Sequence, residues 1–419
     1  MFKKATYFVI ASLIFQFTVT DVAKADGITW TSRVQAGDNQ WRSVAYGNNI
    51  FVAVSYTTGI GNQVMTSPDG INWTARTSAA NRQWRSVTFG NGLFVAVANG
   101  TFNSETGNRV MTSPDGIDWT ARTSTSDSAW IAVTYGNGVF VATSYTSGTG
   151  NQVMSSPDGI NWTARTSAAN GEWYGVTYGN GLFVAVSRAG ASDRVMTSPD
   201  GTTWTAITTP VGLQLDWRSV TYGNGLFVAV GASGTGTRVM TSPDGTTWTL
   251  RTSAADITWT SVTYGNGSFV AVAQNGTGNG VMTSPDGITW TSRTSAADST
   301  WNGVTYADGI FVSVSITGTN RVMTSGEIGL GARTAEAARV AAVNAEAARV
   351  AAAAAEAARK AKEQRELTEI LSIIPELGKL SLNIGETTKS LTGQKCVKGK
   401  KINYVYKGTK CPKGFARAR

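Results

Sequence analysis

Histidine is absent from this chain of 419 residues, and the two cysteines, Cys396 and Cys411, both lie near the C-terminus. These facts exclude a Ser-His-Asp triad, a histidine general base and histidine metal ligands, and they leave the first 395 residues without a thiol nucleophile. Carboxylate chemistry is the remaining route to catalysis. Arginine, tyrosine and Asp or Asn side chains remain for binding.

Variable polar residues recur at fixed places in a repeated motif, W-x-x-V-T-Y-G-N-G-x-F-V-A-V. The motif begins at Trp41, Trp84, Trp130, Trp173, Trp217, Trp259 and Trp301. The residue after each tryptophan varies although its surroundings barely change: Arg42, Arg85, Ile131, Tyr174, Arg218, Thr260 and Asn302. The third residue before each tryptophan is Asp, Asn or Gln: Asp38, Asn81, Asp127, Asn170, Gln214, Asp256 and Asp298.

These two sets predict a concave polar site if the repeats surround an axis. Arg42, Arg85, Arg218 and Tyr174 would then face a ligand beside an acidic ring made by Asp38, Asp127, Asp256 and Asp298. Such a surface suits a carbohydrate or an anion. A purely structural role is the alternative, because Asp and Asn before a strand form Asx-turns and arginine stacks on aromatic rings.

The elements that would position these residues are short strands. A second motif, D-G-x-x-W, begins at Asp26, Asp69, Asp115, Asp158, Asp200, Asp244 and Asp286, and the two motifs account for all 14 tryptophans. Each period of 42 to 46 residues contains four strand patterns separated by G-N-G or P-D-G turns, which in the first repeat are 41–46, 50–55, 63–67 and 72–76. The period and the pattern predict an all-β, seven-bladed propeller.

The offset of the two motifs predicts how the propeller closes. The first D-G-x-x-W precedes any W-x-x-V strand, and the last repeat, 301–325, stops before its own D-G-x-x-W. The strand 28–33 is therefore expected to complete the blade that begins at Trp301. This arrangement would remove both open sheet edges.

The stretch Ser67-Pro68-Asp69-Gly70-Ile71-Asn72-Trp73, with its six relatives, resembles the Asp-box (BNR) repeat of sialidase-like and sortilin-like β-propellers. That repeat usually reads S-x-D-x-G-x-x-W, so every copy here is one residue shorter. The resemblance implies a propeller in which the Asp boxes form turns remote from any catalytic centre. The tryptophan of each box is expected to fill the space between neighbouring blades.

The same resemblance implies a candidate hydrolase site. Sialidases bind the substrate carboxylate with three arginines and use a tyrosine activated by glutamate and an aspartic acid. Arg42, Arg85 and Arg218 would supply the arginines, and the catalytic candidates are Tyr174, Glu172 and Asp216. This chain departs from the family in having seven repeats instead of six blades, and in placing Glu172 and Tyr174 on one strand.

The segments outside the repeats predict export. Residues 1–25 resemble a secretory signal peptide, with Lys3 and Lys4 before a short apolar run and Ala23-Lys24-Ala25 as a cleavage site. After the propeller, 26–325, we expect a linker at 326–333 and an Ala-rich helical stalk at 334–391. No transmembrane segment is expected in the mature chain, because its apolar runs are shorter than the roughly 20 residues that a bilayer requires.

The tail, 392–419, is basic and contains both cysteines. The formal net charge of +9 equals the seven Lys and two Arg that lie between Lys395 and Arg419, where no acidic residue occurs. In an exported chain the two cysteines are expected to form one local disulfide in a small hairpin. The segment resembles a basic two-cysteine tail of exported proteins of certain aquatic bacteria, which implies secretion or surface retention.

These features together favour a secreted or surface-retained, non-enzymatic propeller that binds an extracellular glycan or other polymer. The alternatives are a sialidase-like glycoside hydrolase and a structural or adhesive surface protein. An anionic cell-envelope component is the expected partner of the tail, and export makes nucleic acid a poorer candidate. Neither a cofactor nor a metal ion is expected.

Overall fold

The computed structural model describes two compact units, residues 1–336 and 337–419. In the first unit the described residues are 26–57, 61–99, 107–146, 150–190, 193–209 and 214–326. In the second they are 349, 356, 359–360, 362–365, 394–405, 410–414 and 416–417. The signal sequence expected at 1–25 lies outside the described residues.

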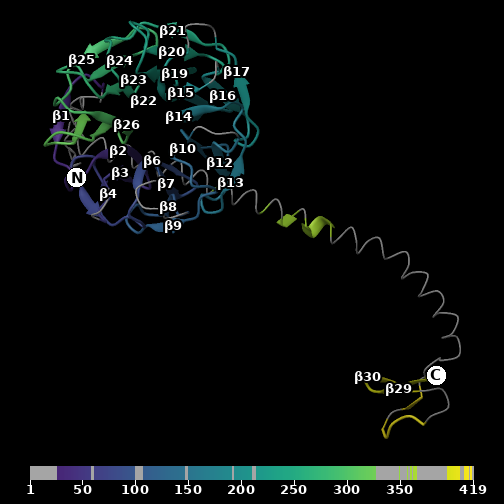
Figure 1. Ribbon diagram of the computed structural model, residues 1–419. Helices are drawn as coiled ribbons and strands as arrows, with labels where there is room; N and C mark the ends of the chain where they lie inside the picture. The colour runs from purple at the N-terminus through teal and green to yellow at the C-terminus, as the bar shows by residue number, and fades with distance from the viewer. Residues whose placement is uncertain are drawn as a thin grey trace, which may run out of the picture. The chain divides into compact units, whose positions relative to one another are not determined.

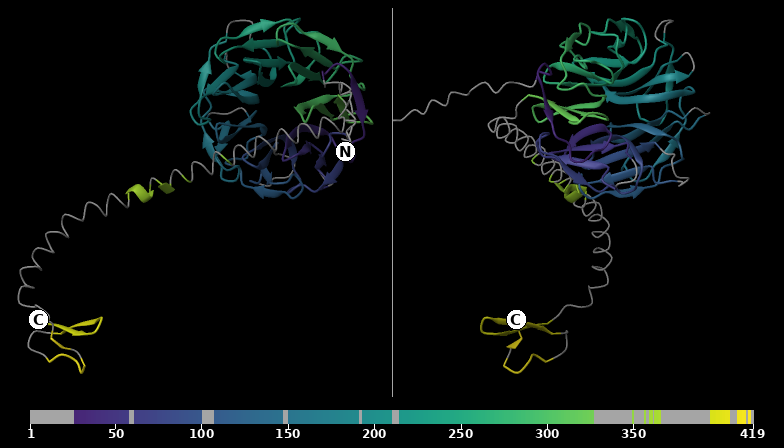
Figure 2. Two further views of the ribbon diagram at one scale, coloured as in Figure 1. Left: turned by 180° about the vertical axis from the view of Figure 1, so that it is seen from behind. Right: turned by 60° about the vertical axis from the view of Figure 1, so that its left-hand side comes forward.

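The first unit is a propeller of seven four-stranded antiparallel sheets (Figure 1). The first blade consists of β2 (Trp41–Gly47), β3 (Ile50–Ser55), β4 (Val64–Ser67) and β5 (Thr74–Arg76). In Figure 1 the strands β2, β6, β10, β14, β22 and β26 surround the centre, whereas β9, β13, β17, β21 and β25 lie at the rim. Figure 2 shows the same ring of blades from two other directions. The predicted architecture is confirmed.

The same order of four strands recurs in the next five blades. The second and third blades contain β6 (Gln83–Gly90), β7 (Leu93–Asn99), β8 (Val110–Ser113) and β9 (Thr120–Arg122), then β10 (Trp130–Gly136), β11 (Val139–Ser144), β12 (Val153–Ser156) and β13 (Thr163–Arg165). The fourth contains β14 (Gly171–Gly179), β15 (Leu182–Gly190), β16 (Val195–Ser198) and β17 (Thr205–Ile207). The fifth and sixth contain β18 (Trp217–Gly223), β19 (Leu226–Gly231), β20 (Val239–Ser242) and β21 (Thr249–Arg251), then β22 (Trp259–Gly265), β23 (Ser268–Ala273), β24 (Val281–Ser284) and β25 (Thr291–Arg293).

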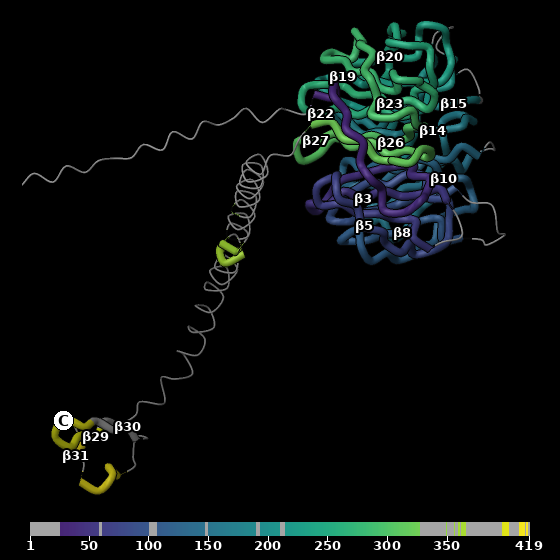
Figure 3. The backbone as a smooth tube through the Cα atoms, turned by 90° about the vertical axis from the view of Figure 1, so that its left-hand side faces the viewer, coloured from purple at the N-terminus to yellow at the C-terminus, as the bar shows by residue number. Residues whose placement is uncertain are grey.

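The seventh blade joins the two ends of the propeller. It contains β26 (Trp301–Ala307), β27 (Ile310–Ser315), β28 (Val322–Ser325) and, as its outer strand, β1 (Trp30–Arg33). β1 pairs antiparallel with β28, so that Trp30 lies opposite Ser325. In Figure 3 the purple N-terminal segment runs beside the green β27 of the same blade. Because β1 supplies the strand that the last repeat lacks, the closure predicted from the motif offset is confirmed.

Tight turns connect the first two strands of each blade. In the second blade Asn91 and Gly92 both have positive φ, 48° and 73°, as a type I′ hairpin requires. The glycine that ends the inner strand has a different role. A Cβ atom on Gly47 would lie 2.0 Å from the ring of Phe89 in the next blade, so only glycine lets that ring pack against the backbone.

The hydrophobic core consists of seven clusters, each of which lies between two blades. Trp41 and Met65 of the first blade pack with Val312 and Val314 of the last. Trp248, from a D-G-x-x-W motif of the fifth blade, packs with valines of the fourth. The first tryptophans of the seven W-x-x-V motifs, which lie on the inner strands, are fully buried. Both motif tryptophans therefore join neighbouring blades, as predicted for the D-G-x-x-W copy, and the large apolar area of each indole stabilises that junction.

The P-D-G turns are held by their aspartates. Asp69 Oδ1 accepts hydrogen bonds from the backbone N–H groups of Ile71 and Asn72 and from the hydroxyl of Ser67, at 2.8 to 2.9 Å. The indole Nε1 of Trp73 donates to the carbonyl of Gly70. These bonds satisfy backbone groups of the turn, which accounts for the Asp-Gly sequence by turn geometry alone.

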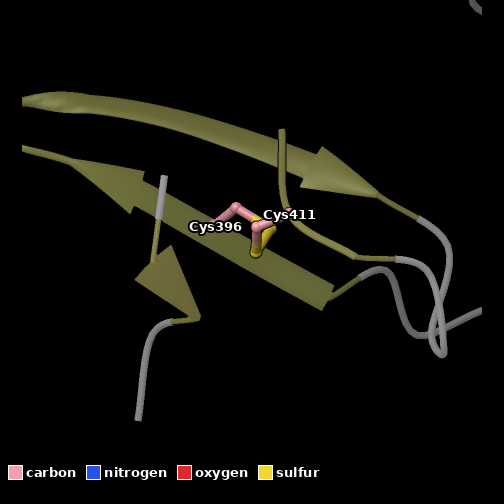
Figure 4. Close-up of a disulfide and its surroundings, with 2 residues drawn as sticks. All are labelled: Cys396 and Cys411. Carbon is pink, nitrogen blue, oxygen red and sulfur yellow. A yellow bond between two sulfur atoms is a disulfide. The ribbon is translucent and has the colours of Figure 1, made fainter. Parts of the chain in front are cut away.

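The second unit contains a disulfide-linked sheet. β29 (Gln394–Lys398) and β30 (Lys401–Val405) form the predicted hairpin, and β31 (Ala416–Arg417) adds a third strand that was not predicted. Cys396 on β29 is bonded to Cys411 (Figure 4). Most of the predicted stalk, 334–391, lies outside the described residues, and a long continuous helix stays a prediction. None of the helical segments that the structure describes is long and apolar enough to span a membrane.

The turn aspartates make stability depend on pH. Although burial opposes it, hydrogen bonding by Asn72, Ile71 and Ser67 lowers the pKa of Asp69 to about 2. Similar bonds lower the pKa at the corresponding turns, those of Asp115, Asp158, Asp200, Asp244 and Asp286. An unfolded-state carboxyl has a pKa of about 3.9, so this stabilisation is present above about pH 5 and is lost as pH falls toward 2.

We therefore expect the urea midpoint of the propeller to fall steeply between about pH 4 and pH 2. Asp158→Asn should reduce this pH dependence, because an amide at that turn cannot be protonated in the same range. The control is Asp118→Asn, since the Asp118 carboxylate makes none of the turn's hydrogen bonds described above. Equal pH profiles for the two variants would contradict the assignment.

Candidate functional site

A β-bulge in every inner strand creates the candidate site. The pairing of β2 with β3 shifts register between Trp41 and Ser43, so Arg42 is an extra residue opposite the partner strand. The same shift follows the first tryptophan of the other six repeats. A bulge re-aims the side chain of its extra residue. In each blade that residue is the variable one identified from the sequence.

We call these seven bulge residues the inner ring. They come together around one central pocket, with a volume of about 170 Å³, and the strand residues that follow them form its walls. A smaller pocket of about 100 Å³ shares the same side chains. The inner ring consists of Arg42, Arg85, Ile131, Tyr174, Arg218, Thr260 and Asn302. The structure thus brings together the three arginines and the tyrosine that the sequence singled out.

Arg42 and Arg85 share one aromatic neighbour. Their guanidinium carbons lie 4.9 Å and 4.4 Å from the ring centre of Tyr56, a cation–π geometry. Arg42 also donates from Nη1 to Oδ1 of Asn302, at 2.7 Å. The Nε atoms of both arginines are buried and make no hydrogen bond within the described part of the chain.

Arg42 lies in an electrostatically unfavourable environment. Burial lowers the pKa of Arg42 to about 10, and the nearby charge of Arg85 contributes to the shift. Asn302 is neutral, and no carboxylate among the described residues forms an ion pair with Arg42 or Arg85. The positive charges of Arg42 and Arg85 are therefore not neutralised by any carboxylate among the described residues.

The opposite part of the inner ring is neutralised. Arg218 contacts Asp216 through two nitrogens, with Nε 2.7 Å from Oδ1 and Nη2 2.8 Å from Oδ2. Arg188 lies 3.6 Å from Asp216 and 3.7 Å from Glu172. Both arginines also lie over the ring of Tyr174. Two arginines and two carboxylates thus form a balanced network.

An outer ring of variable residues, missed by the sequence analysis, supports the inner one. Each member lies 15 residues after the first tryptophan of its W-x-x-V motif: Tyr56, Asn99, Tyr145, Arg188, Ala232, Gln274 and Ile316. Tyr145 packs against Tyr174, with ring centres 5.9 Å apart, and Gln274 donates to Asn302. The spacing of 15 residues is the same in all seven repeats, so the outer ring could have been identified from the sequence.

The predicted acidic ring does not form part of the pocket wall. None of Asp38, Asp127, Asp256 and Asp298 is among the residues that line it. Three of them accept a hydrogen bond from a loop glycine N–H, at 2.6 to 2.8 Å: Asp127, Asp256 and Asp298. Asp38 is bonded instead to Arg321, at 2.5 Å across the closing junction. These contacts tie loops together.

Two aspartates of the acidic ring form ion pairs with arginines at a fixed spacing in the sequence. An arginine 18 residues before Asp127 and Asp256 forms an ion pair with each, in the pairs Arg109–Asp127 at 3.3 Å and Arg238–Asp256 at 3.5 Å. Position 280, which precedes Asp298 by the same interval, is glycine. Burial lowers the pKa of Arg109, and Asp127 opposes this shift.

The three catalytic candidates are close together but are bonded to arginines. Asp216 is engaged by Arg218 and Arg188, and Glu172 by Arg188. Between Tyr174 and Glu172 the described structure contains no hydrogen bond, although a tyrosine nucleophile needs a base within hydrogen-bond reach. Nor do the described residues contain a group of three or more His, Cys, Asp or Glu side chains arranged to hold a metal ion.

Comparison with known proteins identifies the fold. No protein-family model and no curated protein sequence matches the chain. Among solved structures it is similar to YCF48 from Cyanidioschyzon merolae, with 14% identity and a TM-score of 0.52 over 71% of this chain and 98% of that chain. It also aligns with the computationally designed protein Ika8, with 11% identity and a TM-score of 0.46 over 71% and 100% of the two chains. The resemblance to Asp-box propellers rests on the repeat motif alone.

The structural role of the acidic ring can be measured at Asp127. The side chain of its partner Arg109 is only 5% exposed, so Asp127→Asn should lower the free energy of unfolding by about 1–3 kcal/mol. Asp298→Asn is the matched control, because it changes the same repeat position where no arginine stands at the corresponding place. Equal losses, measured by chemical denaturation, would show that the ion pair contributes nothing.

Proposed function

We propose that the propeller binds an acidic extracellular glycan at the central pocket and does not cleave it. The observation that carries this proposal is the convergence of Arg42 and Arg85 on one pocket without a carboxylate partner among the described residues. Arginine forms strong, directional hydrogen bonds with carboxylate, sulfate and phosphate oxygens. An anionic group would supply the missing negative charge.

The pocket admits a small part of a ligand. Its volume of about 170 Å³ is below the roughly 300–1,000 Å³ of sites that enclose a drug-sized molecule. A polymer would therefore insert one terminal sugar or one charged substituent, and the remainder would lie over the mouth. Tyr145 and Tyr174 offer aromatic surface there, and the network of Arg188 and Asp216 offers hydrogen-bond donors and acceptors.

Binding without cleavage is supported by the state of the carboxylates. A glycosidase usually needs two carboxyl groups on either side of the scissile bond, one as acid and one as base or nucleophile. Asp216 and Glu172 are instead engaged by arginines. Sialidase-like hydrolysis and a structural or adhesive role without a ligand are the alternatives that the experiment below separates.

We propose in addition that the chain is exported and that its basic unit binds an anionic envelope component. The disulfide between Cys396 and Cys411 supports an oxidising compartment. Five lysines described in the tail, 392–419, are exposed: Lys398, Lys400, Lys401, Lys410 and Lys413. Such a surface attracts anionic lipid head groups or wall polymers, and salt screens the attraction.

A panel of acidic and neutral glycans should test the pocket. The chain from residue 26 is incubated with the panel, and the bound and free fractions are read by mass spectrometry. Intact acidic glycans should be retained, and Arg42→Gln and Arg85→Gln should each weaken retention about tenfold or more, because each removes a charged hydrogen-bond donor.

Arg122→Gln is the matched control. Arg122 lies on the outer strand β9, where its Nε donates to Thr112, so its loss should leave retention unchanged. Trimmed glycans in the free fraction would show a hydrolase and contradict the proposal. Retention that does not depend on Arg42 and Arg85 would exclude the pocket, and no retention of any glycan would favour the structural role.

Replacing the five exposed lysines with glutamine should abolish binding of the full chain to vesicles that contain phosphatidylglycerol. The unchanged chain should bind at low salt and be released near 0.5 M salt, because charge screening shortens with ionic strength. Cys396 and Cys411 stay in place, so the disulfide is kept. Undiminished vesicle binding by the variant would contradict the role of the tail.

A further inference from the structure

Three arginines line the pocket, but only two of them lack a carboxylate partner among the described residues. Arg218 makes a two-nitrogen contact with Asp216, so its charge is already balanced. Arg42 and Arg85 have Tyr56 and Asn302 as their polar or aromatic partners and no described carboxylate. The pocket thus presents two positive charges and not three.

These two charges are held close together by neutral groups. Both guanidinium groups lie within 5 Å of the ring centre of Tyr56. Both buried Nε atoms lack a hydrogen bond in the described structure, although burial of an unpaired charge is costly. A ligand with two negative charges would neutralise the pair, whereas a ligand with one would leave one positive charge without a partner.

We propose that the charged group recognised by Arg42 and Arg85 is a phosphate monoester on a sugar of the glycan. This inference rests on the proposed function. Among the common acidic groups of glycans, a carboxylate and a sulfate ester each carry one negative charge, whereas a phosphate monoester carries between about 1.5 and 2 at pH 7. Its three terminal oxygens also match the donors of two guanidinium groups, each of which binds two oxygens.

A set of hexoses that differ only in the acidic group tests this inference. Glucose 6-phosphate, glucose 6-sulfate, glucuronic acid and glucose are titrated into the full chain by calorimetry, in a buffer without phosphate. We expect glucose 6-phosphate to bind at least about tenfold more tightly than the sulfate or the uronate, and glucose to show no binding. Arg42→Gln and Arg85→Gln should each remove this preference.

The double variant Arg218→Gln/Asp216→Asn separates the two uncompensated arginines from the neutralised one, because it removes an arginine together with its carboxylate and leaves Arg188 with Glu172. Its effect on the affinity for glucose 6-phosphate should be less than a third of the effect of Arg85→Gln. The basic tail is present in every variant, so any phosphate bound there cancels in the comparison. Thermal melting confirms that each variant is folded. If either Arg42→Gln or Arg85→Gln fails to fold, the other still tests the inference.

The pH dependence gives an independent readout, since the chain contains no histidine. The groups around the pair are Tyr56, Tyr174, Arg218 and Asn302, with Asp216, Glu172 and Arg188 beyond them. Histidine alone among side chains has an ordinary pKa between 5 and 8. The second pKa of a phosphate monoester is about 6. Affinity for glucose 6-phosphate should therefore fall up to about fourfold from pH 7.5 to 5.5, and affinity for the sulfate should not.

The outcomes distinguish this inference from the proposed function. Sulfate or uronate binding as tight as phosphate binding, or an equal pH response of the sulfate and phosphate sugars, would overturn the phosphate assignment and leave acidic-glycan binding intact. A loss with the double variant Arg218→Gln/Asp216→Asn equal to that with Arg85→Gln would overturn the division of charges. If none of the acidic sugars or acidic glycans of the panel binds, the proposed function fails as well.

Discussion

Each inner strand must send two side chains, a tryptophan and a valine three residues later, into the same core between blades. Side chains of a regular strand alternate between its faces, so residues three apart point in opposite directions. Trp41 and Val44 nevertheless share one cluster, and the bulge between Trp41 and Ser43 makes this possible. The extra residue is released from the core. Seven such residues meet around the axis and form the pocket.

The same constraint separates what is constant in the repeats from what varies. Trp and Val fill fixed spaces between blades. Six of the seven inner strands end in glycine, and a Cβ on Gly47 would collide with Phe89. The inner-ring side chains do not fill space between blades, because they line the pocket and contact one another. This explains how a nearly identical sequence can repeat around the ring and still present arginine, tyrosine, isoleucine, threonine and asparagine at the centre.

Electrostatics then divides the pocket into two parts. The network of Arg188, Arg218, Asp216 and Glu172 is balanced, whereas Arg42 and Arg85 are held by Tyr56 and Asn302, which are neutral. The outer ring is essential to this division, since Tyr56 and Arg188 both belong to it. The chemical character of the site therefore comes from pairs of variable residues, one from each ring.

Much of the fold followed from the sequence because its signals are repeated seven times. The blade pattern, the closing strand at Trp30 and the set around Arg42 needed only the period and the offset of two motifs. The bulge was missed because the strand assignment considered residue types and not the spacing of Trp41 and Val44. The acidic residues were placed beside the arginines because Asp127 was not compared with Arg109, 18 residues earlier. Arg218 is neutralised by Asp216, only two residues earlier in the same repeat. The contacts of Arg42 with Asn302 and of Arg85 with Tyr56 join different blades, and no single repeat contains them.

The third strand of the tail sheet, β31, was missed for a different reason: two residues, Ala416 and Arg417, are too few to give a pattern. We propose that the bulges direct two uncompensated arginines into one anion-binding pocket. Anomalous diffraction from crystals of the chain soaked with selenate, a dianion, would locate the bound anion. The strongest anomalous peak should lie within hydrogen-bond distance of both Arg42 and Arg85, surrounded by the inner ring. A pocket without a peak while selenate binds elsewhere, or inner-ring side chains that point away from the axis, would contradict it.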